Sequence, residues 1–423
     1  MTGGLKLYAG LTRLFHGVAP GLLRDRARKG KEDPVRWRER LGETGALRPD
    51  SPVVWFHGVS VGESLSALPV IERLTALRPD LKVVITTATT TSAEILAKRL
   101  PAGATHQFAP IDTPQAAEAF LDHWRPGLAV FIESDIWPNL LAGLQARQVP
   151  YALLSARITE KTFRGWQTWK GAMQRVLGGY SLVMAQDRDS DERLKAMGVV
   201  TAPIANLKTV GAPLNVDHEV LAALDAIVGE RRVLLAASTH HGEDALIAHA
   251  LEPYVRDGDL LILVPRHPQK AEDIRIDIEA LGLHVARRSL KEPLTGTTQV
   301  YMADTLGELG LFFSLADIVV MGGSFQSGVG GHNPLEPARL GKSVITGPDL
   351  FNWQAVFNEL IEAGAAFRVD SASDLGFLVG ELRQKPDAIA IADRQALEVS
   401  CREAGTLDRV WAALAPLLPE RTS

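Results

Sequence analysis

The sequence predicts an α/β protein with two doubly wound domains, each a mostly parallel sheet covered by helices. Short β-rich runs alternate with longer helical patterns, and this alternation starts again after a loop at residues 211–214. The chain has 423 residues, of which 46% are hydrophobic, so it exceeds the length that one core usually serves. We therefore expect two Rossmann-like units.

Each strand is predicted from a short apolar run bounded by turn residues. In the first half these runs are Val53–His57, Lys82–Thr86, Leu128–Glu133, Tyr151–Leu154 and Ser181–Ala185. In the second half they are Arg232–Ala236, Leu260–Pro265, Val300–Ala303, Asp317–Gly322 and Ser343–Thr346. We expect domains at residues 43–213 and 214–423 that face each other across a cleft, where ligands usually bind. The last helical segment, about Ala388 to Leu418, is placed to pack back on the first domain.

Residues 1–42 are predicted to form a separate N-terminal segment. Apolar side chains recur in it at helical spacing: Leu7, Tyr8, Leu11, Leu14, Phe15, Val18 and Leu22. Eight basic residues against four acidic ones follow between Arg24 and Arg40. Such a sequence suits an anionic bilayer surface, so we expect an amphipathic, membrane-associating helix. The alternative is a helix that packs on its own domain beside a solvated charged face.

Composition narrows the functional classes. A net charge of -5 and a pI near 6.1 give no global attraction to nucleic acid, so no such partner is expected. Cys401 is the single cysteine, which excludes an intramolecular disulfide and is consistent with a reducing compartment. The sequence contains no run of about 18 uncharged apolar residues, so an ordinary transmembrane helix is not expected. Nothing in the sequence indicates an oligomeric state.

The first candidate site residue is Glu63, at the end of the run His57-Gly58-Val59-Ser60-Val61-Gly62-Glu63. This run follows a predicted strand, so the carboxylate lies at the carboxyl edge of the sheet, where α/β proteins bind ligands. There it can act as a general base toward a hydroxyl. Alternatively, it is a first-turn acid that only complements the helix dipole.

A second group follows the strand Leu128–Glu133. Glu133 and Asp135 add acids at the same edge, and Trp137 could stack on a sugar face. The alternative is a helix cap with Trp137 in the core. Lys208 adds a cation near the predicted hinge, although a lone lysine is usually a surface residue.

In the second half, Ser238-Thr239-His240-His241-Gly242-Glu243 follows one strand and Pro265-Arg266-His267 ends another. Arg266 and His267 can meet a phosphate and a carboxylate, because an arginine matches such anions with two parallel donors. Zinc is disfavoured, because adjacent histidines do not share one helix face.

The strongest pattern runs from Gly322-Gly323-Ser324-Phe325 to Gly328–Pro337. Glycines such as Gly323, with Ser324 beside it, let a phosphate approach the backbone closely. Asn333 is the predicted N-cap, Pro334 the first helical residue, and Glu336 the acid three residues after the cap. The amides of this helix start can hold a nucleotide phosphate, and Glu336 can instead accept bonds from ribose hydroxyls. The alternative is a turn that merely starts a helix.

A run of acids, Asp187-Arg188-Asp189-Ser190-Asp191, superficially offers the acidic pair of a metal-dependent transferase. We interpret it as a helix cap.

Taken together, these motifs resemble those of the 3-deoxy-D-manno-octulosonic acid (Kdo) transferases, glycosyltransferases of the GT-B fold. The resemblance spans nearly the whole chain in the family's order and approximate spacing. It rests on Trp55–Glu63, Glu133–Asn139, Asn206–Lys208, Ser238–Asp244, Val264–Pro268, Gly322–Phe325 and Gly330–Pro337, with Gly347-Pro348 and Asn352.

The resemblance implies inverting transfer of Kdo from CMP-Kdo to the glucosamine 6-hydroxyl of a lipid A precursor (lipid IVA), releasing CMP, in lipopolysaccharide biosynthesis. It implies Glu63 as the proton acceptor, with Glu133 and Lys208 supporting the transition state. Donor contacts would come from Pro265, Arg266, Leu306, Gly307, Glu308, Asn333, Pro334, Leu335 and Glu336. No metal or cofactor is implied. The expected location is the cytoplasmic face of the inner membrane, peripheral or monotopic.

Two positions depart from the family pattern. Asp135 stands where glutamate is usual, and Thr209-Val210 stand where Phe-Asp is common. Two rival functions remain open at this level. One is a GT-B transferase or epimerase that uses a UDP-sugar, and the other is a catalytically silent protein that binds the membrane surface.

Overall fold

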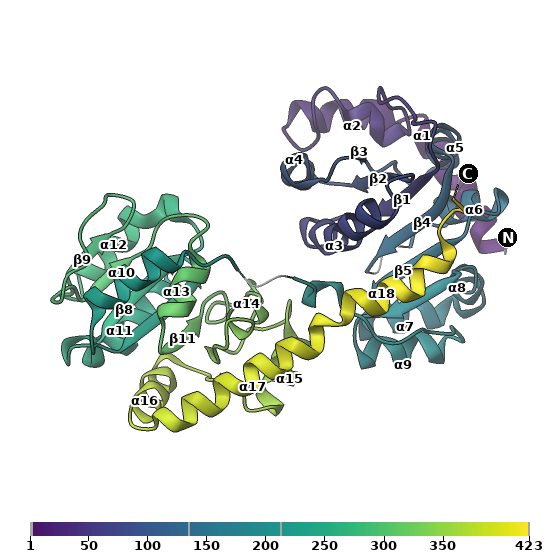
Figure 1. The fold of residues 1–423 in the computed structure, drawn as a ribbon. Helices are drawn as coiled ribbons and strands as arrows, with labels where there is room; N and C mark the ends of the chain where they lie inside the picture. The colour runs from purple at the N-terminus through teal and green to yellow at the C-terminus, as the bar shows by residue number, and fades with distance from the viewer. Residues whose placement is uncertain (1–2, 134–135, 212–213, 422–423) are drawn as a thin grey trace. The chain divides into compact units, whose positions relative to one another are not determined.

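The computed structural model describes residues 3–133, 136–211 and 214–421, without the side chains of Glu403 and Ala404. The chain divides into two compact units, residues 1–211 with 405–423, and residues 212–404. Each unit has a parallel sheet between layers of helices (Figure 1). The predicted domain boundary, between residues 213 and 214, falls beside residues 212 and 213, which lie outside the described residues.

The first unit has a six-stranded sheet in the order β3-β2-β1-β4-β5-β6. Its strands are β1 (Val53–His57), β2 (Lys82–Thr87), β3 (Ala104–Phe108), β4 (Pro126–Ile132), β5 (Tyr151–Ala156) and β6 (Leu182–Ala185). Its α-helices are α1 (Gly3–His16), α2 (Ala19–Arg28), α3 (Val61–Leu77), α4 (Thr90–Arg99), α5 (Pro114–Trp124), α6 (Pro138–Ala146), α7 (Glu160–Thr168), α8 (Lys170–Leu177), α9 (Arg188–Ala196) and α18 (Thr406–Leu414). Short 3-10 helices are η1 (Trp37–Leu41), η2 (Leu207–Thr209) and η4 (Ala415–Leu417).

The strands of this sheet are buried on both faces, because helices cover each one. Along β1, Trp55 packs on the side of α5 and α6, whereas Phe56 packs on the side of α3. The chain returns to this unit at its end, since Val410 and Leu414 of α18 belong to the same core as Phe56. In Figure 1, α18 is the yellow helix at the end of the chain.

Replacing Leu414 tests whether α18 is part of this core. The side chain is fully buried, so Leu414→Ala should lower the free energy of unfolding by about 2–5 kcal/mol through lost burial and the cavity left behind. Leu47→Ala is the matched control, because Leu47 is 93% exposed. Urea unfolding followed by tryptophan fluorescence measures both. Equal midpoints would contradict the packing of α18.

The second unit has a seven-stranded sheet in the order β13-β12-β11-β7-β8-β10-β9. Its strands are β7 (Val233–Thr239), β8 (Leu260–Pro265), β9 (Val285–Arg287), β10 (Val300–Met302), β11 (Ile318–Met321), β12 (Val344–Thr346) and β13 (Ala366–Arg368). Its helices are α10 (His218–Val228), α11 (Glu243–Arg256), η3 (Pro268–Lys270), α12 (Ala271–Glu279), α13 (Leu309–Leu315), α14 (Leu335–Ala338), α15 (Gln354–Glu362), α16 (Ala372–Arg383) and α17 (Pro386–Ala404).

Helix α1 contacts α5 and α6 of the first unit through its polar side. The Tyr8 hydroxyl donates to Asp112 (3.0 Å), and Thr12 Oγ1 accepts from the side-chain amide of Asn139 (3.0 Å). His16 Nδ1 lies 2.9 Å from the Thr113 hydroxyl. Within the described residues, no helix is both long and apolar enough to cross a bilayer.

Candidate active site

In the first unit, the strand order reverses between β1 and β4. Connections leave such a switch point toward opposite faces of the sheet, which opens a ligand site outside the carboxyl ends of the strands. Glu63 follows β1 and Glu133 follows β4, so both predicted acids lie at this point. Lys208 lies on η2, which contacts α3. The structure thus brings the three predicted catalytic residues to one edge of one sheet.

Glu63 is held by a capping box at the start of α3. Its Oε2 accepts from the backbone amides of Val59 and Ser60, while the Ser60 hydroxyl accepts from the Glu63 amide. A Cβ at Gly58 would lie 3.0 Å from the Glu63 Cβ, so glycine permits this tight approach. Oε1 accepts no hydrogen bond from the described residues. The structural role predicted as the alternative is therefore real, and it leaves one carboxylate oxygen open.

Glu133 is buried and adopts a left-handed backbone with φ +65°. Its Oε1 lies 2.8 Å from Lys208 Nζ, but no aligned hydrogen bond joins them, so the contact is an ion pair. Asn206 caps the turn that carries Lys208, and the Ser155 hydroxyl accepts from the amide of Leu207. These bonds hold the lysine ammonium beside the buried acid. A backbone in this region costs about 1–3 kcal/mol and is often found at functional sites.

His57 and Trp137 lie beneath this edge. His57 is fully buried, its Nδ1 is 2.8 Å from the Thr86 hydroxyl, and burial followed by the nearby Arg40 lowers its pKa to about 3. The imidazole is therefore neutral near pH 7. Trp137 meets His57 edge-on at 5.7 Å and packs against the core, as in the core alternative for this residue. Asp135 lies outside the described residues.

In the second unit the order reverses between β7 and β11. Glu243, at the start of α11, joins the loops that follow these two strands. Its carboxylate is fully buried and accepts from the backbone amides of His240 (2.9 Å), Gly323 (2.6 Å) and Phe325 (2.8 Å). Glu243 thus fixes the glycine-rich loop after β11. Among the described residues, no three His, Cys, Asp or Glu side chains form a metal-binding group.

The predicted anion-binding side chains after β8 are exposed. Pro265 ends the strand, and the Arg266 amide donates to the carbonyl of Thr239 (2.8 Å). The Arg266 guanidinium makes no ion pair with the described residues, and His267 meets His240 edge-on at 5.4 Å. Arg266 is therefore an available cation beside the loops of the switch point.

The glycine-rich loop differs in part from its prediction. The Ser324 hydroxyl is buried, where it donates to the Met321 carbonyl and accepts from the Gly347 amide (both 2.8 Å). The whole residue is buried, and its carbonyl accepts from the Asp349 amide (3.0 Å). Asn333 does act as a cap, because its Oδ1 accepts from the Leu335 amide (3.1 Å).

The predicted helix start at Pro334 is wrong by one residue, since α14 begins at Leu335. The helix ends at Ala338, because the chain turns through Gly341 at φ +69°. A single turn aligns few peptide dipoles, so the predicted dipole contributes little here. Pro334 and Leu335 are buried, whereas Glu336 is half-buried and its pKa is raised by desolvation.

The loop Leu306-Gly307-Glu308 is built around an ion pair that the sequence patterns did not indicate. The Glu308 carboxylate accepts from both ends of the Arg288 guanidinium and from the Thr305 hydroxyl. This pairing lowers the pKa of Glu308, and the charge of its carboxylate is used to hold the loop on Arg288. Gly307 has φ +87° and Leu306 is 84% exposed, so the backbone and Leu306 remain available to a ligand.

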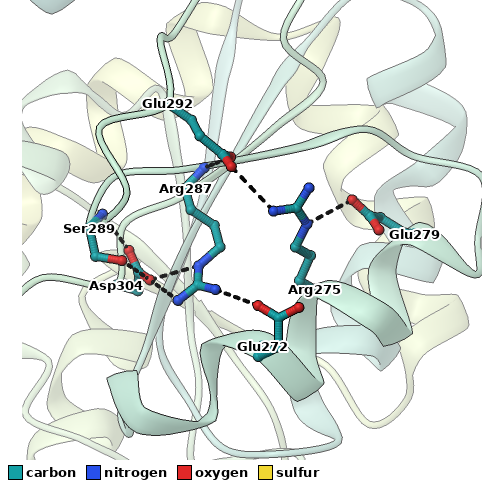
Figure 2. A network of polar contacts seen from close by, with 7 residues as sticks. All are labelled: Glu272, Arg275, Glu279, Arg287, Ser289, Glu292 and Asp304. Atoms are coloured by element: carbon teal, nitrogen blue, oxygen red, sulfur yellow. Dashed lines mark hydrogen bonds and ion pairs between the residues drawn. The ribbon is translucent and has the colours of Figure 1, made fainter.

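A polar network fixes the chain segment before this loop (Figure 2). Arg287 donates to Asp304 (2.8 and 3.0 Å), which also accepts from the Ser289 hydroxyl (2.6 Å). Glu292 accepts from the Arg287 amide (2.7 Å) and from Arg275 (3.2 Å). Because Arg288 follows Arg287 directly, this network positions the guanidinium that holds Glu308.

His240 and His332 form the contact that sequence reasoning missed. The two rings are stacked at 5.2 Å, and their Nε2 atoms are 3.0 Å apart. Burial lowers the pKa of both, that of His332 to about 4. The available signal was that each residue follows a strand of the switch point. The acids at Asp187, by contrast, include a cap as predicted, because Asp187 accepts from the Ser190 amide (2.7 Å).

Asp244 should make the second unit less stable as pH rises. Burial raises its pKa from 3.8 to about 6, and its Oδ2 has no partner. The folded state therefore favours the protonated acid, and this contribution is lost between about pH 4 and 6. A shift of two pKa units corresponds to about 3 kcal/mol as an upper value. Asp244→Asn should flatten the dependence of the urea midpoint on pH, whereas the exposed control Asp273→Asn should not. A variant that keeps the wild-type slope would contradict this origin.

The two doubly wound units, each with polar residues at its switch point, define a glycosyltransferase-like protein of the GT-B fold. A solved glycosyltransferase from Rickettsia africae shares this fold, with a TM-score of 0.59 at 12% identity over 88% of this chain and all of that one. A family model described as 3-deoxy-D-manno-octulosonic-acid transferase (kdotransferase) matches residues 35–210.

Two curated relatives extend this match across the chain. The probable mitochondrial 3-deoxy-D-manno-octulosonic acid transferase of Arabidopsis thaliana is 34% identical, covering 93% of this chain and 91% of its own. The 3-deoxy-D-manno-octulosonic acid transferase of Haemophilus influenzae is 31% identical, covering 90% and 92%. The chain belongs to the Kdo transferase family and is a glycosyltransferase.

Proposed function

We propose that the protein transfers Kdo from CMP-Kdo to the glucosamine 6-hydroxyl of a lipid A precursor, with inversion and without a metal ion. Family membership supports the sugar transferred. The observation that carries the mechanism is the state of Glu63, whose Oε2 is bound to backbone amides while Oε1 stays open at the switch point of the first sheet. That arrangement fixes the direction of a carboxylate and keeps a basic oxygen available.

In the proposed step, the acceptor hydroxyl oxygen bonds to the ketose carbon of Kdo as the carbon–oxygen bond to phosphate breaks. The bonding electrons leave with CMP, and the hydroxyl proton passes to Glu63. Glu133 is a poorer candidate for the base, because it is buried and paired with Lys208. The pair instead supplies a fixed ammonium that can stabilise charge in the transition state.

The donor is assigned to the second unit. Arg266 offers an unpaired guanidinium, and the loop from Gly323 to Asn333 offers backbone amides other than those already bound within the fold, such as Gly323 and Phe325 on the Glu243 carboxylate. The backbone of Leu306 and Gly307 adds further donors. A nucleotide phosphate fits this combination of cation and glycine-rich backbone.

Glu63→Gln separates catalysis from folding, because glutamine can still accept the amide bonds of the capping box. Transfer should fall by roughly 10²-fold or more, while CMP binding and stability stay near wild type. Asp374→Asn is the matched control, since Asp374 also stands in a first helical turn beside its capping residue, Ser371. The rate is measured with CMP-Kdo and a lipid A precursor.

A Glu63→Gln variant with the wild-type rate would exclude Glu63 as the base, whereas wild-type protein that transfers no sugar would favour the silent binding protein. Competition by UDP rather than CMP would favour the rival that uses a UDP-sugar. Loss of transfer on adding a chelator would contradict the metal-independent part of the proposal.

We propose that the protein lies at the cytoplasmic face of the inner membrane and that helix α1 contacts the bilayer. Its apolar residues point away from the protein, with Leu7 64%, Leu11 60% and Leu14 77% exposed. The helix binds its own unit by its polar residues and by Leu5, so the core-packing alternative does not explain the exposed leucines. A helix with this arrangement suits a bilayer interface.

The basic residues between Arg24 and Arg40 contribute less to the proposed membrane contact than their number suggested. Arg36 and Arg40 are half-buried, and Arg36 pairs with Glu39 (2.9 Å). A hollow of about 350 Å³ beside the start of α1 adds membrane-compatible side chains, since Trp169, Lys170 and Arg175 line it. Aromatic rings and cations are favoured at the level of lipid head groups.

Charge placed on the apolar face of α1 should abolish membrane binding. The double variant Leu11→Asp with Leu14→Asp should stay with the soluble fraction in flotation with vesicles rich in anionic phospholipid, because two carboxylates oppose insertion. Leu47→Asp changes a leucine outside the helix that is even more exposed, and this variant should float like wild type. Undiminished flotation of the double variant would remove α1 as the contact.

A further inference from the structure

The histidine pair, His240 and His332, belongs to two segments that the fold locks together. His240 follows β7, and His332 closes the glycine-rich loop after β11. A Cβ at Gly323 would lie 2.7 Å from the His332 Cδ2, so the imidazole rests directly on the loop backbone. Glu243 binds the amides of both His240 and Gly323, which fixes the two rings relative to each other.

The groups around the pair favour one arrangement of its protons. The Ser238 backbone favours a proton on His332, and the ring nitrogen free to carry it is Nδ1, because Nε2 faces His240. In the neutral pair, His332 Nε2 is then the acceptor, and His240 Nε2 carries the shared proton. This leaves His240 Nδ1 with a lone pair and no hydrogen bond to the described residues.

A further proton therefore has one place to bind, His240 Nδ1. Its arrival would create a positively charged N–H donor without breaking the contact between the two Nε2 atoms. Two protons cannot occupy the 3.0 Å gap between those atoms, so the pair titrates as one unit that accepts a single extra proton.

The surroundings hold the free pair neutral but suit a bound anion. Burial opposes its charge, as do Arg266 and His267. The Glu243 carboxylate favours the charge on His240 but is shared among three amides. The other titratable or charged groups of the packed elements are His241, Asp244, Glu336 and Arg339. An anionic ligand would reverse the balance, because it favours the protonated imidazole.

We propose that the histidine pair binds the phosphate of the CMP moiety and takes up a proton from solvent as it does so. The phosphate would accept a hydrogen bond from His240 Nδ1–H, beside the Arg266 guanidinium. This inference rests on the proposed function for its ligand, CMP. It adds His240 and His332 to the donor site, where the sequence motifs had indicated the neighbouring residues.

The test is calorimetric titration of the full-length protein with CMP at about pH 7.5, in buffers of different ionisation enthalpy. A phosphate monoester has its second pKa near 6, so CMP itself is already a dianion. Wild type should take up about half a proton or more per CMP bound. Its affinity for CMP should fall by up to about tenfold per pH unit above neutrality.

His240→Gln and His332→Gln should weaken CMP binding by about tenfold and abolish the proton uptake, because a charge-assisted bond to phosphate is lost. His249→Gln is the control, since His249 lies on α11 beside Glu252 at the surface and should bind as wild type. Thermal unfolding of each variant checks that the unit is folded.

The outcomes are distinct. If CMP binds wild type without proton uptake, or if uptake persists in both glutamine variants, the histidine pair is not the phosphate partner although the donor assignment stands. If CMP does not bind wild type at any pH while the protein is folded, both the donor assignment and this inference fail. Uptake in wild type and its loss in both variants supports the pair as the phosphate partner.

Discussion

The reversal of strand order in each sheet decides where the candidate site residues of each unit lie. Parallel strands bring all their carboxyl ends to one edge, and a reversal sends neighbouring connections to opposite faces. The order reverses between β1 and β4 in the first sheet and between β7 and β11 in the second. Glu63, Glu133 and His240 follow these strands, and Arg266 follows β8, the neighbour of β7. Side chains far apart in the sequence are thereby assembled without any need for local motifs.

Some residues at these strand ends have an unfavourable backbone conformation, which nearby polar contacts stabilise. Glu133, Ser155 and Ser238 all have positive φ, between 56° and 65°, which is costly for residues with a Cβ. Each is tied down. Glu133 pairs with Lys208, the Ser155 hydroxyl binds the turn before Lys208, and the Ser238 backbone lies against His332. Buried carboxylates play a similar part, since Glu243 joins two loops and Glu308 holds Arg288.

The sequence predicted most of this fold because central parallel strands are buried on both faces and read as continuous apolar runs. β1 and β8 were predicted to their last residue. The missed strands β3, β9 and β13 lie at or near sheet edges and are short or polar, so their pattern is weak. Glu63, Glu133 and Lys208 could be placed at one edge because strand ends alone decide that.

The parts of the site that could not be predicted depend on tertiary partners. The Glu308 carboxylate is committed to Arg288, 20 positions earlier, and the Ser324 hydroxyl to the amide of Gly347, 23 positions later. The histidine pair joins residues 92 positions apart. No local pattern reports such pairs, and each changes which atoms are left for a ligand. Backbone amides and Arg266 thus gain weight in the donor site, while the side chains of Glu308 and Ser324 lose it.

Transfer of Kdo to a lipid A precursor can be measured by mass spectrometry of the lipid product. Purified protein is incubated with CMP-Kdo and lipid IVA in the presence of a chelator. We expect the mass of the lipid to rise by one or more Kdo residues as CMP is released. A lipid of unchanged mass, with protein that is folded and binds CMP, would contradict it.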